Sequence, residues 1–215
     1  MNGYRLLTTI VSAGKGKLIV KSAVDAGSFG GTVMSGRGIS PSSIAAILGI
    51  DTKKDVVFIV AESEKKDTIL NAIVDSTKNE KKHLGCIFVS DVDSLSRTGE
   101  IIKTGGGNSM SENTPNDLIT VILNSGYADD AMAAARKAGA GGGTVIKARG
   151  TAKEGDESFF GVQIVPEKEM LLIVVDHEKK DAVMSAIQKL ECLSQPGSGI
   201  VFSSPVSQFH LLGKK

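Results

Sequence analysis

A nine-residue phrase occurs twice in this chain and constrains its fold more than any other feature. Residues 30–38 read GGTVMSGRG and residues 142–150 read GGTVIKARG, with six of nine positions identical. The copies are 112 residues apart, and farther along, at a spacing of 114 residues, Glu64-Lys-Lys-Asp67 aligns with Glu178-Lys-Lys-Asp181. Because the match continues in register over most of the chain, the sequence predicts a tandem duplication, with two extra residues in one loop of the second copy.

The length of the chain agrees with two copies of a small domain. Its 215 residues are enough for one large domain or for two of roughly 100 residues each. We therefore expect repeat 1 over residues 1–97 and repeat 2 over residues 116–215. The segment between them, 98–115, is rich in Gly, Ser and Asn, as a flexible linker is.

Composition disfavours several classes of protein. The chain is 41% hydrophobic and 23% charged, which is typical of a soluble globular protein. Its net charge is +1, so neither nucleic acid nor an anionic membrane is expected as the main partner. The longest apolar runs, such as 56–61, are far shorter than the ~18 residues that suggest a membrane span. The two cysteines, Cys86 and Cys192, are not at equivalent positions of the repeats, so we expect no disulfide framework. The N-terminus has no signal-peptide pattern, and we expect a cytoplasmic protein.

Both repeats show the same order of strand and helix patterns. In repeat 1, apolar and β-branched runs predict strands at 6–12, from 32, at 56–61 and at 87–89, with helices at 17–26 and after residue 63. Repeat 2 predicts strands at 118–123, 144–146, 170–175 and 200–202, with helices at 128–138 and 179–190. Gly27 is expected to end the first helix in the left-handed conformation, and Ser63 to cap the second.

Strand–helix–strand twice in each repeat predicts the fold class. We expect an α+β protein of two tandem ferredoxin-like βαββαβ sandwiches, each with its helices on one face of a sheet. The other face of such a sheet needs burial, and we expect the chain to oligomerise through it.

Three motifs resemble the PII nitrogen-regulatory signal-transduction family. The first is Gly-x-Thr-Val followed by a basic residue and Gly, at 30–38 and again at 142–150. The second is Ile87-Phe-Val-Ser-Asp-Val92 with Arg97-Thr-Gly-Glu100 downstream, and the third is Gly197-Ser-Gly-Ile-Val-Phe202. The resemblance covers nearly the whole chain as two copies, and the set of motifs is more specific than any one alone.

The resemblance implies a PII-like fold in trimeric rings, with adenine nucleotide (ATP or ADP) held in clefts between neighbouring units. It also implies that a loop between the second and third strands signals to a regulated transporter or enzyme. Three chains would supply six units, enough for two stacked trimeric rings. Glycine turns and converging cations suit phosphate. The ligand-binding candidates are Arg37, Gly38, Lys54, Arg97, Arg149, Gly150, Lys168, Gly197, Ser198 and Gly199.

The chain departs from the family's pattern at the loop and at the phosphate-binding turn. The loop tyrosine that the family modifies is absent, and residues 40–49 instead predict a short helix. The lysine of the phosphate-binding turn is replaced by Cys86 in repeat 1 and by Ile200 in repeat 2. A nucleotide site in this chain must therefore be composite, weakened or changed in ligand.

Several candidates have an alternative, purely structural role. Arg37 and Arg149 either bind an anion or pair with a carboxylate at a sheet edge. Lys54 and Lys168 either lie in a ligand cleft or are ordinary solvated lysines before a strand. The turn at 197–199 either binds phosphate or is only a tight connection.

Two further motifs favour the structural interpretation. The turn Gly14-Lys-Gly-Lys17 resembles part of a phosphate-binding loop but lacks the full pattern, so a plain turn is expected. His83 and Cys86 have the spacing of metal ligands. The sequence contains no second His/Cys pair that could complete a metal site with them, so we expect no metal.

The sequence leaves three hypotheses for the function. No Ser, His and carboxylate set suggests catalysis, so the expected function is a non-catalytic PII-like sensor, in nitrogen regulation, that binds a small ligand and signals to a protein. The alternative is an oligomeric scaffold that kept the ring and lost the ligand. An RNA-binding ferredoxin-like domain is disfavoured because only 4% of residues are aromatic.

Overall fold

The described part of the chain forms two compact units. The computed structural model describes residues 3–39, 52–92, 94–97, 100–103, 114–150, 158–159, 162–163, 167–193 and 198–214. Unit 1 comprises Met1–Ser35, Lys53–Asp117 and Ser204–Lys215, and unit 2 comprises Gly36–Thr52 and Leu118–Ser203. The units therefore differ from the two halves of the sequence, because each includes a segment from the other half.

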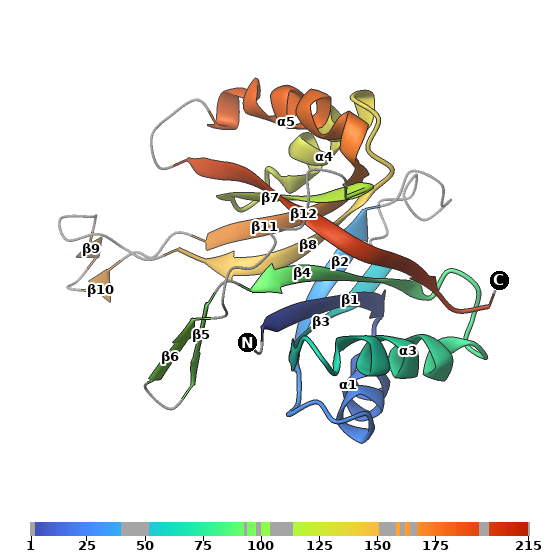
Figure 1. Cartoon of the computed structure of the whole chain (residues 1–215). Helices are drawn as coiled ribbons and strands as arrows, with labels where there is room; N and C mark the ends of the chain where they lie inside the picture. The colour runs from blue at the N-terminus through green and yellow to red at the C-terminus, as the bar shows by residue number, and fades with distance from the viewer. Residues whose placement is uncertain are drawn as a thin grey trace. The chain divides into compact units, whose positions relative to one another are not determined.

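Unit 1 is a five-stranded sheet with two helices. Its strands lie in the order β2, β3, β1, β4, β12, and β1 pairs antiparallel with both β3 and β4. Helices α1 and α3 lie on one face of these strands (Figure 1). The elements are β1 (Tyr4–Ser12), α1 (Gly16–Asp25), β2 (Thr32–Ile39), β3 (Thr52–Glu62), α3 (Lys66–Thr77), β4 (Gly85–Val92) and β12 (Gly199–Leu212). Strand β2 contributes only residues up to Ser35, and β12 only those from Ser204 onward.

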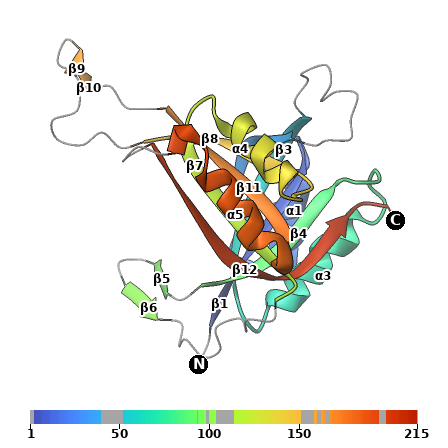
Figure 2. The same cartoon turned by 90° about the horizontal axis from the view of Figure 1, so that it is seen from above.

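Unit 2 repeats this arrangement. Its strand order is β2, β8, β11, β7, β12, in which β8 pairs antiparallel with both β2 and β11. Helices α4 and α5 cover one face of β7, β8 and β11 (Figure 2). The elements are β7 (Asn116–Asn124), α4 (Ala128–Lys137), β8 (Gly143–Arg149), β11 (Glu167–Asp176), η1 (His177–Lys179), α5 (Lys180–Gln188) and η2 (Glu191–Leu193). Strand β9 (Ser158–Phe159) pairs with β10 (Val162–Gln163).

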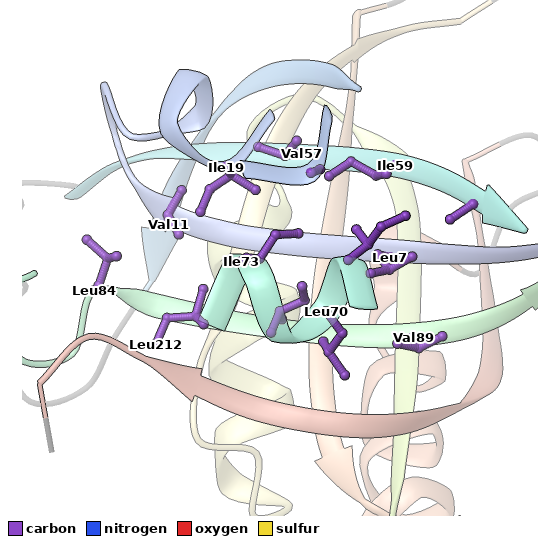
Figure 3. Packing of buried hydrophobic residues seen from close by; sticks show 14 residues of the cluster. Leu7, Val11, Ile19, Val57, Ile59, Leu70, Ile73, Leu84, Val89 and Leu212 are labelled. Carbon is purple, nitrogen blue, oxygen red and sulfur yellow. The ribbon is translucent and has the colours of Figure 1, made fainter. Parts of the chain in front are cut away.

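Each unit has its own hydrophobic core between its helices and its sheet. Figure 3 shows the core of unit 1, where side chains from the central strands meet those of α1 and α3. Ile59 of β3 and Ile73 of α3 are fully buried there, and Ile173 and Ile187 are fully buried in unit 2. Each of these side chains contributes about 1.5–3 kcal/mol by leaving water. The helical and strand periodicities of the sequence thus place the same apolar residues inward in both units.

The sequence predicted the C-terminal end of the first helix in each unit but not the N-terminal cap of α3. Gly27 and Gly139 have φ angles of +97° and +102°, so both adopt the left-handed conformation that glycine accepts without cost. The prediction that Ser63 caps α3 is wrong. Residues 63–65 form a turn, and the residue before the helix is Lys65, which makes no side-chain capping bond.

Two further predictions concern the segments that connect the strands and helices. The segment predicted as a linker contains β6 (Glu100–Lys103), which forms a hairpin with β5 (Ser94–Arg97). The short helix predicted over 40–49 lies outside the described residues. Among the helices that are described, none is long and apolar enough to cross a membrane.

Candidate anion-binding site in unit 2

A carboxylate in each unit binds the turn that joins the first strand to the first helix. In unit 1, Oδ2 of Asp55 accepts hydrogen bonds from the backbone N–H groups of Gly14 (2.9 Å) and Gly16 (2.8 Å). Backbone N–H groups at such a turn are the donors that a phosphate-binding loop presents to its ligand. Because Asp55 already occupies them, the Gly14–Lys17 turn is a structural turn.

The same arrangement recurs in unit 2 at the equivalent residue. There Oε2 of Glu169 accepts from the N–H groups of Gly126 (3.0 Å) and Ala128 (3.3 Å). Glu169 is 7% exposed, and its position corresponds to that of Asp55 in the sequence repeat. Two positions that align in the sequence therefore make the same contact in the structure.

Arg37 pairs with carboxylates. Its guanidinium donates to both carboxylate oxygens of Asp129, at 2.9 and 3.2 Å, and lies 3.7 Å from Oε1 of Glu169. Asp129 is in the first turn of α4, so Arg37 joins the end of β2 to the start of that helix within unit 2. Of the two roles that the sequence allowed for Arg37, anion binding or pairing with a carboxylate, this geometry corresponds to the second. Its repeat equivalent, Arg149, is exposed and makes no such contact in the described part of the chain.

Three cations surround a hollow of about 310 Å³ at the ends of β8 and β11. Its lining residues are Ser125, Lys147, Ala148, Arg149, Glu167 and Lys168. The antiparallel register sets Ala148 opposite Lys168 and Arg149 opposite Glu167, which brings Arg149 and Lys168 to the same end of the strand pair. With three cations and one carboxylate, this basic pocket has a positive electrostatic potential suited to an anion. It contains two of the predicted ligand-binding residues.

A second hollow in unit 2 adjoins the basic pocket. This groove has a volume of about 730 Å³ and is lined by Asn124, Tyr127, Asp130, Ala133, Ala134, Lys137, Leu190, Glu191, Cys192 and Ser198. Asn124 connects the two hollows, because it lines the groove while its Oδ1 accepts a 2.6 Å hydrogen bond from Nζ of Lys168. Ser198, a predicted ligand-binding residue, thus lies in the hollow next to Arg149 and Lys168.

The two thiols are in different settings. Burial raises the pKa of Cys86 to about 11, against a smaller opposing effect of the Lys54 charge. Burial also raises the pKa of Cys192 in the groove, with a further contribution from the Asp130 carboxylate. Both thiols are therefore protonated at neutral pH and poor nucleophiles.

The remaining predicted residues are dispersed. Lys54 is half-buried in β3 of unit 1, and Gly38 lies in β2, where its carbonyl accepts a 3.4 Å bond from the Thr52 hydroxyl. Gly150 directly follows β8. Arg97 ends β5, and Gly197 lies outside the described residues.

Gly199 has a packing role. A Cβ at this position would overlap the carbonyl oxygen of Ile122, so the glycine lets β12 approach β7 closely. This contact agrees with the interpretation of the 197–199 turn as a tight connection.

Sequence reasoning missed Lys147 and Asn124. Lys147 precedes Arg149 by two residues on a strand, so their side chains point to the same face, and the period of two was a usable signal. Asn124 had no such signal, because its repeat equivalent is Ser12, whose hydroxyl lies 3.4 Å from the carbonyl oxygen of Leu84.

The segment that contains both hollows also matches a known family. Residues 116–212 match the model of the nitrogen regulatory protein P-II family. That is the family which the motifs resemble. The P-II match covers the second half of the chain, including every residue that lines the basic pocket and the groove.

A solved structure gives a second comparison. The crystal structure of Arabidopsis thaliana PII bound to citrate is similar over 51% of this chain and 97% of that chain, at 20% sequence identity and a TM-score of 0.40. No curated protein matches the chain.

Proposed function

We propose that this chain is a non-catalytic, PII-like regulatory protein that binds a small anionic ligand in the basic pocket of unit 2. The observation that supports the proposal is that Lys147, Arg149 and Lys168 all line one hollow within the P-II-matching segment. Charge-assisted hydrogen bonds from such cations to phosphate or carboxylate are roughly twice as strong as neutral ones. Arg149 also offers a planar fork that fits either group in a bidentate manner.

The ligand we propose is an adenine nucleotide such as ATP or ADP. Its phosphates would bind in the basic pocket and its uncharged part in the adjoining groove of about 730 Å³. Small-molecule sites in proteins have volumes of about 300–1,000 Å³, so the groove has a suitable size. The resemblance to the family supports the nucleotide class, while the lost lysine at the Ile200 position favours a changed set of contacts.

We also propose that the two repeats arose by duplication and that three chains assemble into trimeric rings. The matching contacts of Asp55 and Glu169, and the matching glycines at 27 and 139, support the duplication. In the ring, the loops after Gly38 and Gly150 would report ligand occupancy to a regulated protein in nitrogen regulation. Light scattering of the purified chain tests the assembly, and a stable monomer would argue against the rings.

Isothermal titration with ATP, ADP, AMP, cyclic dinucleotides and S-adenosylmethionine tests the ligand. We expect heat from one of the nucleotides. Arg149→Gln and Lys168→Gln should each weaken that binding tenfold or more, because a hydrogen bond to a charged group contributes about 1.5–3 kcal/mol. Lys54→Gln, the repeat equivalent of Lys168 in unit 1, is the matched control and should bind as the wild type does.

A ligand-free scaffold is the second candidate. The carboxylate contacts of Arg37 and of the Gly14–Gly16 turn favour it, because they use groups that would otherwise face an anion. The scaffold hypothesis expects no heat from any of the five ligand types. It also expects that Lys168→Gln leaves partner binding unchanged.

A further inference from the structure

The turn between α3 and β4 of unit 1 brings basic residues from two parts of the sequence together. Lys81, Lys82 and His83 are exposed in this turn, and Lys214 is exposed beside them. The backbone fixes the neighbourhood, because the N–H of residue 214 donates to the carbonyl of Glu80 at 3.2 Å. The N–H of Leu84 likewise donates to the carbonyl of Leu212 at 3.1 Å. We call the group Lys81, Lys82, His83, Lys214 and Leu211 the basic tip.

The basic tip is held rigidly on the core of unit 1. Leu84 and Leu212 are both 2% exposed and pack into the same hydrophobic cluster, where Figure 3 shows them close together. A Cβ at Gly213 would overlap the carbonyl oxygen of Lys81, so the two segments touch backbone to backbone. The tip is therefore a preformed surface.

The positive charges of the tip are not neutralised by nearby acids. Glu80 is paired with Lys15 at 2.8 Å, and Asp75 with Lys78 at 2.6 Å. In the described part of the chain, the side chains of Lys81, Lys82 and Lys214 make no ion pair. The corresponding residues of repeat 2 are Gln195, Pro196 and Gly197, so the fold itself does not require cations here.

An exposed apolar side chain accompanies these charges. Leu211 is 73% exposed and lies opposite Cys86 in the β4–β12 pair, directly beside the turn. Leu211 thus places an aliphatic side chain beside the basic residues of the turn. An anionic lipid surface accepts both features, because its headgroups attract lysines and its acyl boundary accepts an aliphatic side chain.

Other polyanions fit the tip less well. The tip has no Phe, Tyr or Trp side chain on which the bases of a single-stranded nucleic acid could stack, and His83 is its one ring. An acidic peptide would be expected to add as a strand along β12. Strand β12 is interrupted by Pro205 and by an irregularity between Ser207 and His210, where Gln208 has a φ of +50°. Prolines and bulges are devices that prevent strand addition.

We propose that the basic tip is a peripheral docking surface for membranes that contain anionic lipids. The lysines provide electrostatic attraction, and Leu211 inserts at the headgroup boundary. The proposal does not depend on ligand binding in unit 2. A net charge of only +1 is compatible with the proposal, since the fold concentrates the lysines at one point.

Vesicle sedimentation of the full chain tests the docking surface. The expected result is binding to vesicles of 30 mol% phosphatidylserine in phosphatidylcholine at 25 mM salt, none to pure phosphatidylcholine, and strong reduction at 300 mM salt. Each lysine near an anionic surface raises affinity about fivefold, so Lys81→Gln, Lys82→Gln and Lys214→Gln together should weaken binding roughly a hundredfold. Leu211→Ser should weaken it several-fold at either salt concentration.

A matched triple variant controls for the loss of charge. Lys179→Gln, Lys180→Gln and Lys189→Gln remove the same charge from the α5 region of unit 2 and should bind vesicles as the wild type does. The proposal is overturned if the wild type does not bind the anionic vesicles, or if the two triple variants bind them equally. Binding of duplex DNA or an acidic peptide that depends on the tip, without vesicle binding, would also overturn it.

Discussion

Lys168 donates a 2.6 Å hydrogen bond from Nζ to Oδ1 of Asn124, and this bond joins the basic pocket of unit 2 to the adjoining groove. Asn124 ends β7 and Lys168 is near the start of β11. The pair therefore holds a cation at the boundary of the two hollows.

A change at Asn124 should alter anion binding by its charge more than by its shape. Asn124→Asp places a carboxylate beside Lys168, and two charges about 4 Å apart in water interact by about 1 kcal/mol, so anion affinity should fall about fivefold. Asn124→Ala removes the acceptor without adding charge and should change affinity less than threefold. Titration of both variants with the nucleotide proposed as ligand gives the comparison. Equal losses in the two variants would contradict the electrostatic role.

The glycines at the start of the fourth strand of each repeat should be intolerant of a side chain. A Cβ at Gly85 would overlap the carbonyl oxygen of Ile10, and one at Gly199 that of Ile122. Gly85→Ala and Gly199→Ala should each destabilise the fold by about 3 kcal/mol or more, because the neighbouring backbone cannot move aside. The free energy of unfolding in urea measures the effect. Gly141→Ala, where no atom lies within 4 Å of the new Cβ, is the control and should change it by less than about 0.5 kcal/mol.

The two carboxylates that bind the strand–helix turns should contribute unequally to stability. Asp55→Ala leaves two N–H groups without an acceptor, at a cost of about 1–3 kcal/mol. Glu169→Ala should cost more, since Glu169 is buried and also neighbours Arg37. Urea unfolding of both variants, with the exposed Glu167→Ala as control, measures the difference. A smaller loss for Glu169→Ala than for Asp55→Ala would show that burial does not set the ranking.

The raised pKa of Cys86 should appear both in thiol chemistry and in stability. With a pKa of about 11, roughly one Cys86 in a thousand is a thiolate at pH 8, so iodoacetamide should label Cys192 first. Peptide mass mapping over time gives the two rates.

The same shift has a defined sign for folding. The folded state keeps the Cys86 proton between pH 8.5 and 11 while the unfolded chain releases it, so the contribution of this thiol to stability falls as the pH rises through that range. The stability difference between the wild type and Cys86→Ala should shrink over this interval. A difference that stays constant would contradict the raised pKa.

Much of the fold was predictable because it is local. The periodicity of apolar residues gives the helices and the central strands, and the left-handed glycines at 27 and 139 are visible as the residues that end each first helix. The lengths of β2 and β12 were not predictable. Gly36 and Gly38 in β2 and Pro205 in β12 are poor strand residues, and both strands persist through them because they pair with β8 and β4.

The candidate site was predictable only where the repeat pointed to it. Arg149 was found from its repeat match with Arg37, and Lys168 from the family resemblance and its repeat match with Lys54; the β8–β11 register brings the two to the same end of the strand pair. The partner of Arg37 was not predictable, because Asp129 is 92 residues away and only the pairing of β2 with β8 brings it near. Equivalent arginines thus have different partners, which a comparison of sequences alone does not reveal.

Strands β2 and β12 each supply residues to both units, and this sharing makes the halves of the chain interdependent. A protease cut in the middle of the sequence would release two fragments, each lacking one outer strand segment of its own sheet. Neither fragment would then hold every strand segment of its own unit.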